Sequence, residues 1–219
     1  MIRKIKKSSL IHIVALSVIL LVWNLLGFII KKYFGNVDSI PSYLRLLMMF
    51  FLHSSFLVYI LFFIWDDINI KKELQILFKK KNLFWGIAIG LISLFSVLVI
   101  VPFLPELPHS AVDLISKDNK TLFILFFIYM SLYAPIVEEL MFREFLWNIF
   151  SKKKMSVVFT LIITSLLFAL FHFELIRLPL LFLGGVIYGL PRIFTGRIDI
   201  SLFAHIVNNS IVLIVSIVV

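Results

Sequence analysis

The sequence predicts an all-α protein, a polytopic membrane helix bundle with about seven transmembrane helices and a cytoplasmic amino terminus. Three observations support this. Of the 219 residues, 62% are hydrophobic and 24 are Phe, a composition typical of membrane proteins. The apolar residues fall into seven runs, each near the length of about 20 residues that a helix needs to cross a bilayer. Lys and Arg lie in short clusters between these runs.

The seven apolar runs define the predicted helices. In chain order they cover residues 11–30, 44–65, 84–104, 122–150, 155–173, 175–194 and 198–219. The first run follows a basic segment and is longer than the core of a signal peptide, about 7 to 15 residues, so we expect a retained first span. The fourth run is longer than a span needs. Pro135 in its middle lacks a backbone donor, so we expect a kink there.

The basic residues set the predicted orientation. With the amino terminus inside, six of the 21 Lys and Arg residues lie outside, namely Lys31, Lys32, Arg45, Lys117, Lys120 and Arg177, which leaves 15 inside. The positive excess therefore indicates orientation in a bilayer and not binding to nucleic acid. Segment 66–82 alternates apolar and basic residues. It is either a plain inner loop or a short amphipathic helix on the anionic inner leaflet.

A single integral membrane domain is expected over 1–219, because no Gly/Ser-rich linker and no internal repeat divides the chain. Its halves differ, since 1–119 holds three spans without a motif and 120–219 holds every motif described below. Cysteine is absent, which excludes disulfides and thiolate chemistry. His12, Asn24 and His53 in the first two spans have no partner that the sequence identifies, and we expect structural roles for them.

The ionisable residues of the fourth run form the main candidate site. Each charge at membrane depth costs roughly 2.5 to 3.5 kcal/mol, so such a cluster indicates function. Glu139 and Arg143 are four residues apart and can pair on one helix face, whereas Glu138 lies about 100° away. This spacing favours Glu139 as the partner of Arg143 and Glu138 as a reactive carboxylate. Alternatively, the three residues form only the polar end of the span.

Two further polar pairs lie in later spans. His172 follows Phe168 by four residues, and His205 and Asn209 are also four apart. The second pair can donate to one oxyanion, or it can be an interhelical hydrogen-bond pair. Counted along straight helices, Glu138 and His172 differ in depth by on the order of 10 to 15 Å. A shifted, tilted or kinked span is then needed to bring them together.

In chain order, the segments E-E-L-M-F-R (138–143), F-A-L-F-H (168–172) and H-I-V-N-N (205–209) resemble three motifs of one family. These are the EExxxR, FxxxH and HxxxN motifs of the CAAX protease and bacteriocin-processing family, also called the Abi family of intramembrane proteases. The resemblance covers 120–219, and it implies a protease core there and a membrane-embedded endopeptidase.

The resemblance also implies roles for the motif residues. Glu138 and His172 would activate a water molecule, and His205 and Asn209 would form the oxyanion site. Supporting roles fall to Glu139, Arg143 and Phe168. The expected mechanism needs no metal. On chemistry alone, zinc bound by Glu138, His172 and His205 is an alternative, although the H-E-x-x-H pattern is absent.

The expected function is cleavage of a membrane-associated or secreted peptide or protein precursor, as in bacteriocin or pheromone processing or linked self-immunity. The expected partners are a peptide or membrane-protein substrate and the lipid bilayer, with no nucleic acid and an oligomeric state that the sequence does not set. Localisation in a bacterial cell membrane is expected. The alternative is a non-proteolytic bacteriocin-immunity or scaffold membrane protein. A small transporter or channel ranks last, because the two halves show no repeat.

Overall fold

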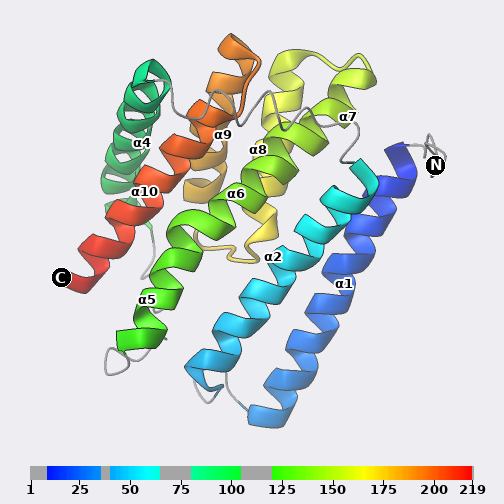
Figure 1. Cartoon of the computed structure of the whole chain (residues 1–219), viewed down its shortest axis with the longest axis vertical. Coiled ribbons are helices and arrows are strands. Elements are labelled where there is room, and N and C mark those ends of the chain that lie inside the picture. The colour runs from blue at the N-terminus through cyan, green and yellow to red at the C-terminus, as the bar shows by residue number, and fades with distance from the viewer. Residues whose placement is uncertain (1–8, 36–39, 65–79, 105–119, 219) are drawn as a thin grey trace.

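The computed structural model describes residues 9–35, 40–64, 80–104 and 120–218, and the regular structure in these ranges is helical (Figure 1). The first helices are α1 (Ser9–Phe34), α2 (Ser42–Ile64) and α4 (Lys80–Ile100), the last followed by a 3₁₀ turn, η2 (Val101–Phe103). The last helices are α8 (Val157–Phe171), α9 (Leu178–Thr195) and α10 (Asp199–Val218). Between these two groups runs one long helix, Lys120–Lys152, which we call the central helix.

Each of the seven predicted apolar runs forms a helix over most of its described residues. Five helices are long and apolar enough to cross a membrane, by length and composition, and they include the central helix and α9. The fifth and seventh predicted spans are shorter apolar helices, Val157–Phe171 and Asp199–Val215. The all-helical prediction is therefore confirmed, but seven full-length spans are not found in the described part of the chain. Most of segment 66–82 lies outside the described residues.

The central helix contains two π-helical turns. It comprises α5 (Lys120–Ile128), η3 (Tyr129–Tyr133), α6 (Ala134–Glu139), η4 (Leu140–Leu146) and α7 (Trp147–Lys152), with η3 and η4 π-helical. In η3 the N–H of Ala134 donates to the Tyr129 carbonyl five residues earlier. The next such bond would need an N–H on Pro135, which has none. The expected distortion at Pro135 is thus present, as a widened turn directly before it.

The other helices pack along the central helix. In Figure 1, α1 and α2 lie side by side on one flank and α4 and α10 on the other. Gly90 of α4 lies against α10, because an added Cβ would come within 2.8 Å of the Ala204 carbonyl oxygen. Gly185 of α9 lies similarly close to Ser165 of α8. These close approaches fix α10 and α9, which carry parts of the candidate site.

Large apolar side chains cover much of the outer surface of this bundle, whereas the charged side chains in the middle of the central helix are buried. Leu21, Phe28 and Phe95 are more than half exposed, whereas Glu139 and Arg143 are fully buried. Charges in a membrane bundle are expected to face its interior. An aromatic and aliphatic core surrounds the buried charges and joins α1, α2, α8 and the central helix; its members include Phe56, Ile60, Phe142, Phe145, Phe168 and Phe171.

Candidate active site

The predicted pair of Glu139 and Arg143 forms the fixed end of the site. Arg143 Nε lies 3.5 Å from Glu139 Oε2, and neither side chain is exposed. Arg143 Nη2 donates to the Gly185 carbonyl at 2.8 Å, and its guanidinium carbon lies 4.9 Å from the ring centre of Phe168. The central helix, α8 and α9 are therefore joined through one arginine. The predicted pairing is confirmed, and Phe168 lies where it can support it.

His205 lies between the two glutamates. Its Nδ1 is 3.0 Å from Glu139 Oε1, and its Nε2 is 3.6 Å from Glu138 Oε2. Its ring stacks on Tyr188 of α9, with ring centres 4.6 Å apart and an angle of 15° between the planes. Glu138 and Glu139 leave the helix in different directions, yet both reach this one ring. The histidine of the last motif is thus held on three sides.

The Glu138 carboxylate lies between two histidines from different helices. Its Oε1 is 3.0 Å from Nε2 of His53 in α2, opposite the contact of Oε2 with His205. Glu138 is 6% exposed. Sequence reasoning missed His53 because its partner is 85 positions away and no motif surrounds it. His53 could have been found from the sequence because it is an ionisable residue in the middle of a predicted span, and such a residue by itself indicates function.

His172 ends α8 close to the same carboxylate. Its Nδ1 donates to the Phe168 carbonyl at 2.9 Å, which leaves Nε2 as the nitrogen that can accept a proton from water. The lengths of the described helices do not support the predicted difference in depth. Glu138 lies about 21 Å along its helix from Lys152, and α8 runs back from the same turn for about 22 Å, so the two residues reach similar depths.

Asn209 contacts the central helix and not His205. Its Nδ2 donates to the Met130 carbonyl at 3.0 Å, the carbonyl that Pro135 leaves without a partner in the π-helical turn. Asn209 therefore has a structural role at η3. Its amide has a second N–H, so the oxyanion role stays a prediction. His12 and Asn24 have the structural contacts expected of them, with the Tyr59 hydroxyl and the Leu20 carbonyl.

Two carboxylates face one guanidinium in this site, so one negative charge is in excess unless a group binds a proton. His53 and His205 both lie near Glu138, and either can hold it. In the described ranges, no three or more His, Cys, Asp or Glu side chains are arranged to hold a metal ion. The three residues of the zinc alternative, Glu138, His172 and His205, are therefore not arranged as such a group. Whether a metal takes part stays a prediction.

The region that carries this site is similar to known proteins. Residues 120–211 match the model of the Rce1-like type II CAAX prenyl endopeptidases. Over 95 residues the chain is 27% identical to the membrane-embedded CAAX protease MroQ of Staphylococcus aureus (strain USA300). That alignment covers 41% of this chain and 38% of the relative. No solved structure matches the chain.

The family match contains Glu138, Glu139 and Arg143 together with His172, His205 and Asn209, and it excludes α2 with His53. The predicted resemblance is confirmed, because the matched model and the relative are both CAAX proteases. Region 120–211 of this chain, which is less than half of its length, is therefore similar to the Rce1-like type II CAAX prenyl endopeptidases, a family of peptidases.

Proposed function

We propose that this protein is an intramembrane endopeptidase that cleaves a membrane-associated or secreted peptide precursor with a water molecule activated by Glu138. The observation that carries the proposal is the buried Glu138 carboxylate, held by His53 at 3.0 Å on one oxygen and near His205 at 3.6 Å on the other. A buried carboxylate flanked by histidines is suited to remove a proton from water next to a peptide carbonyl.

The proposed reaction is hydrolysis by general acid–base catalysis. Glu138, assisted by Nε2 of His172, takes a proton from water as the water oxygen bonds to the carbonyl carbon. Asn209 and His205 lie on α10 and would stabilise the negative oxygen. The proton then moves to the leaving amine as the C–N bond breaks. We propose that no metal is needed, since these groups supply both the base and the oxyanion donors.

The substrate class follows from the relatives' names and from the membrane. Those relatives are a prenyl endopeptidase family and a CAAX protease, so a lipid-modified or membrane-bound peptide is the proposed substrate. Processing of a bacteriocin or pheromone precursor in a bacterial cell membrane is the specific form we propose. The proposed orientation keeps the amino terminus and the turn at Lys152 in the cytoplasm.

The first test is cleavage in proteoliposomes. The purified native chain is mixed with a quenched fluorescent peptide, once farnesylated at a carboxy-terminal CAAX cysteine and once unmodified. Cleavage is expected to fall by about 10²- to 10⁴-fold in Glu138→Gln, the range attributed to a general base. The control is Glu174→Gln, since Glu174 pairs with Arg177 in a partly exposed contact outside the site.

The outcomes separate the hypotheses. Equal cleavage by native protein and Glu138→Gln would exclude the carboxylate as the base. If neither cleaves any peptide but both restore the phenotype of a deletion strain, the immunity or scaffold alternative replaces the protease. Retained cleavage after dialysis against a chelator is expected if no metal takes part.

A further inference from the structure

We infer that His53, in the part of the chain that the family model does not cover, is a positioning residue that holds the Glu138 carboxylate for catalysis. The inference rests on the proposed function and deepens it, because it makes α2 part of the active site. His53 touches the proposed base and is not assigned contact with substrate.

Contacts at both ring nitrogens hold His53 in position. Nε2 lies 3.0 Å from Glu138 Oε1, and Nδ1 lies 2.7 Å from the Tyr129 hydroxyl and 3.1 Å from the Met49 carbonyl oxygen. The ring is 7% exposed and meets Phe171 edge to face, with centres 5.6 Å apart. A histidine held at both nitrogens and packed on one face cannot rotate without losing these contacts.

Because an ionised carboxylate only accepts hydrogen bonds, Nε2 of His53 carries the proton of this contact whenever Glu138 is ionised. If the Tyr129 hydroxyl donates to Nδ1, the neutral ring carries its proton on Nε2 and donates to the carboxylate. If Nδ1 instead donates to the Met49 carbonyl, a donor on Nε2 makes the ring a cation paired with the carboxylate. In both arrangements His53 donates to Glu138 Oε1. Tyr129 therefore acts on the carboxylate through His53.

The consequence is a division of work between the two oxygens of Glu138. Oε1 is fixed by the α2 histidine, and Oε2 points towards His205 of α10. Water activation then falls to Oε2, on the side of His205. Without His53, the carboxylate would keep its charge but lose the partner that fixes its direction, and a misplaced base loses rate.

Two variants of His53 separate positioning from packing. In Gln the side-chain amide nitrogen reaches the place of Nε2, so His53→Gln keeps the donor to Glu138. In Asn it reaches only the place of Nδ1, so His53→Asn keeps the donor next to Tyr129 and Met49 and loses Glu138. The two variants are similar in polarity, and because Asn is also smaller than Gln, the melting temperature of each variant is needed to show how much of its effect is lost packing.

The experiment measures kcat and KM of each variant in the proteoliposome assay, together with the melting temperature in detergent. We expect His53→Asn to lower kcat on the order of 10- to 100-fold with KM unchanged, as for outer partners of reactive groups. His53→Gln should recover most of kcat, and Tyr129→Phe should lower it less than His53→Asn does. Equal kcat for His53→Asn and the native chain would overturn the inference.

A second measurement is independent of activity. Melting temperatures of native protein, His53→Asn, Glu138→Gln and the double variant form a double-mutant cycle. Non-additive shifts are expected because the two side chains are in contact, and additive shifts would contradict that contact. If the native chain cleaves nothing while the shifts are non-additive, the proposed function fails and the catalytic role of His53 fails with it, although its contact with Glu138 is supported.

Discussion

At the scale of single residues, the site is a continuous series of polar contacts in an apolar bundle. It joins side chains of α2, the central helix and α10 and ends on a backbone carbonyl of α9; its members are Tyr129, His53, Glu138, His205, Glu139, Arg143 and Gly185. Removing one member of such a series takes a partner away from buried neighbours, which costs more than the bond itself contributed.

Arg143 is the member whose loss should affect stability most. Arg143→Met keeps an apolar stem but removes the guanidinium, which leaves the fully buried Glu139 without its cation. Breaking a buried pair in this way typically costs about 3–5 kcal/mol. We expect this loss in SDS or thermal unfolding of the protein in detergent micelles. The double variant Glu139→Gln with Arg143→Met should recover part of it, because no buried charge then lacks a partner.

The matched control for Arg143 is Arg177→Met. Arg177 also pairs with a glutamate on its own chain segment, Glu174, but both side chains are partly exposed. Exposed pairs contribute about 0–1 kcal/mol. Equal losses from the two arginine variants would show that burial does not set the importance of Arg143.

At the scale of helices, the position of His205 depends on how closely α10 approaches α4. A Cβ on Gly90 would lie 2.8 Å from the Ala204 carbonyl oxygen and 2.9 Å from Val207 Cβ. Contacts below 3 Å to a backbone atom require the helices to separate. Since Ala204 directly precedes His205, any shift of α10 here moves the histidine that lies between the two glutamates.

Gly90→Ala should therefore reduce both stability and activity. Overpacking of this kind costs typically about 1–3 kcal/mol, and a displacement near 1 Å in a catalytic group can cost about 10²-fold in rate. The melting temperature and kcat of the variant test this. Gly27→Ala is the control, since nothing lies within 4 Å of a Cβ at that position of α1. If the melting temperature and kcat of Gly90→Ala equal those of the native chain, α10 is not held by this contact.

The central helix shows how much of an element the sequence determines. Pro135 predicted a distortion, because a missing backbone donor is a local property of the residue. The partner of the orphaned Met130 carbonyl was not predictable, because it is the side chain of Asn209, 79 positions later. The same limit applies to His53 and Glu138. Pairings within one helix, such as Glu139 with Arg143, follow from spacing, while pairings between helices need the packing.

At the scale of the whole molecule, helix length explains the main error in depth. We expected the segment 155–173 to cross the bilayer, which put His172 far from Glu138. Instead α8 has 15 residues, and at about 1.5 Å per residue it is shorter than the hydrocarbon core of about 30 Å. Hydropathy identifies apolar segments. It does not distinguish a full membrane span from a shorter helix that ends inside the bundle beside the candidate site.

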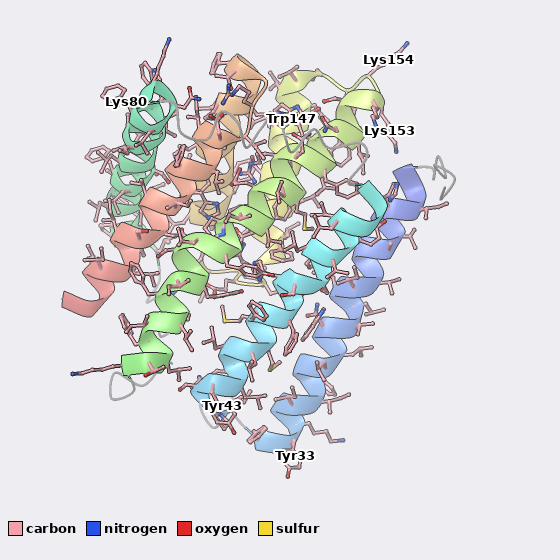
Figure 2. The ribbon with its side chains drawn as sticks, in the orientation of Figure 1. Tyr33, Tyr43, Lys80, Trp147, Lys153 and Lys154 are labelled. Carbon is pink, nitrogen blue, oxygen red and sulfur yellow. The ribbon has the colours of Figure 1, made fainter. Side chains whose placement is uncertain are left out.

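The orientation of the molecule gives the last prediction. Lys153 and Lys154 lie at one end of the bundle with Lys80, and Tyr33 and Tyr43 lie at the other (Figure 2). Because Lys and Arg favour the cytoplasmic side, the lysine end should face the cytoplasm. The chain has no native cysteine, so Lys153→Cys and Tyr33→Cys each give one reactive thiol, and both positions are exposed.

In intact cells, a membrane-impermeant maleimide should label Tyr33→Cys and leave Lys153→Cys unlabelled until the membrane is permeabilised, with the cysteine-free native chain as the blank. The reverse pattern would place the amino terminus outside. Glu138 lies about 21 Å along the central helix from Lys152 and about 27 Å from Lys120, so the expected pattern would put the proposed base slightly nearer the cytoplasmic end of that helix.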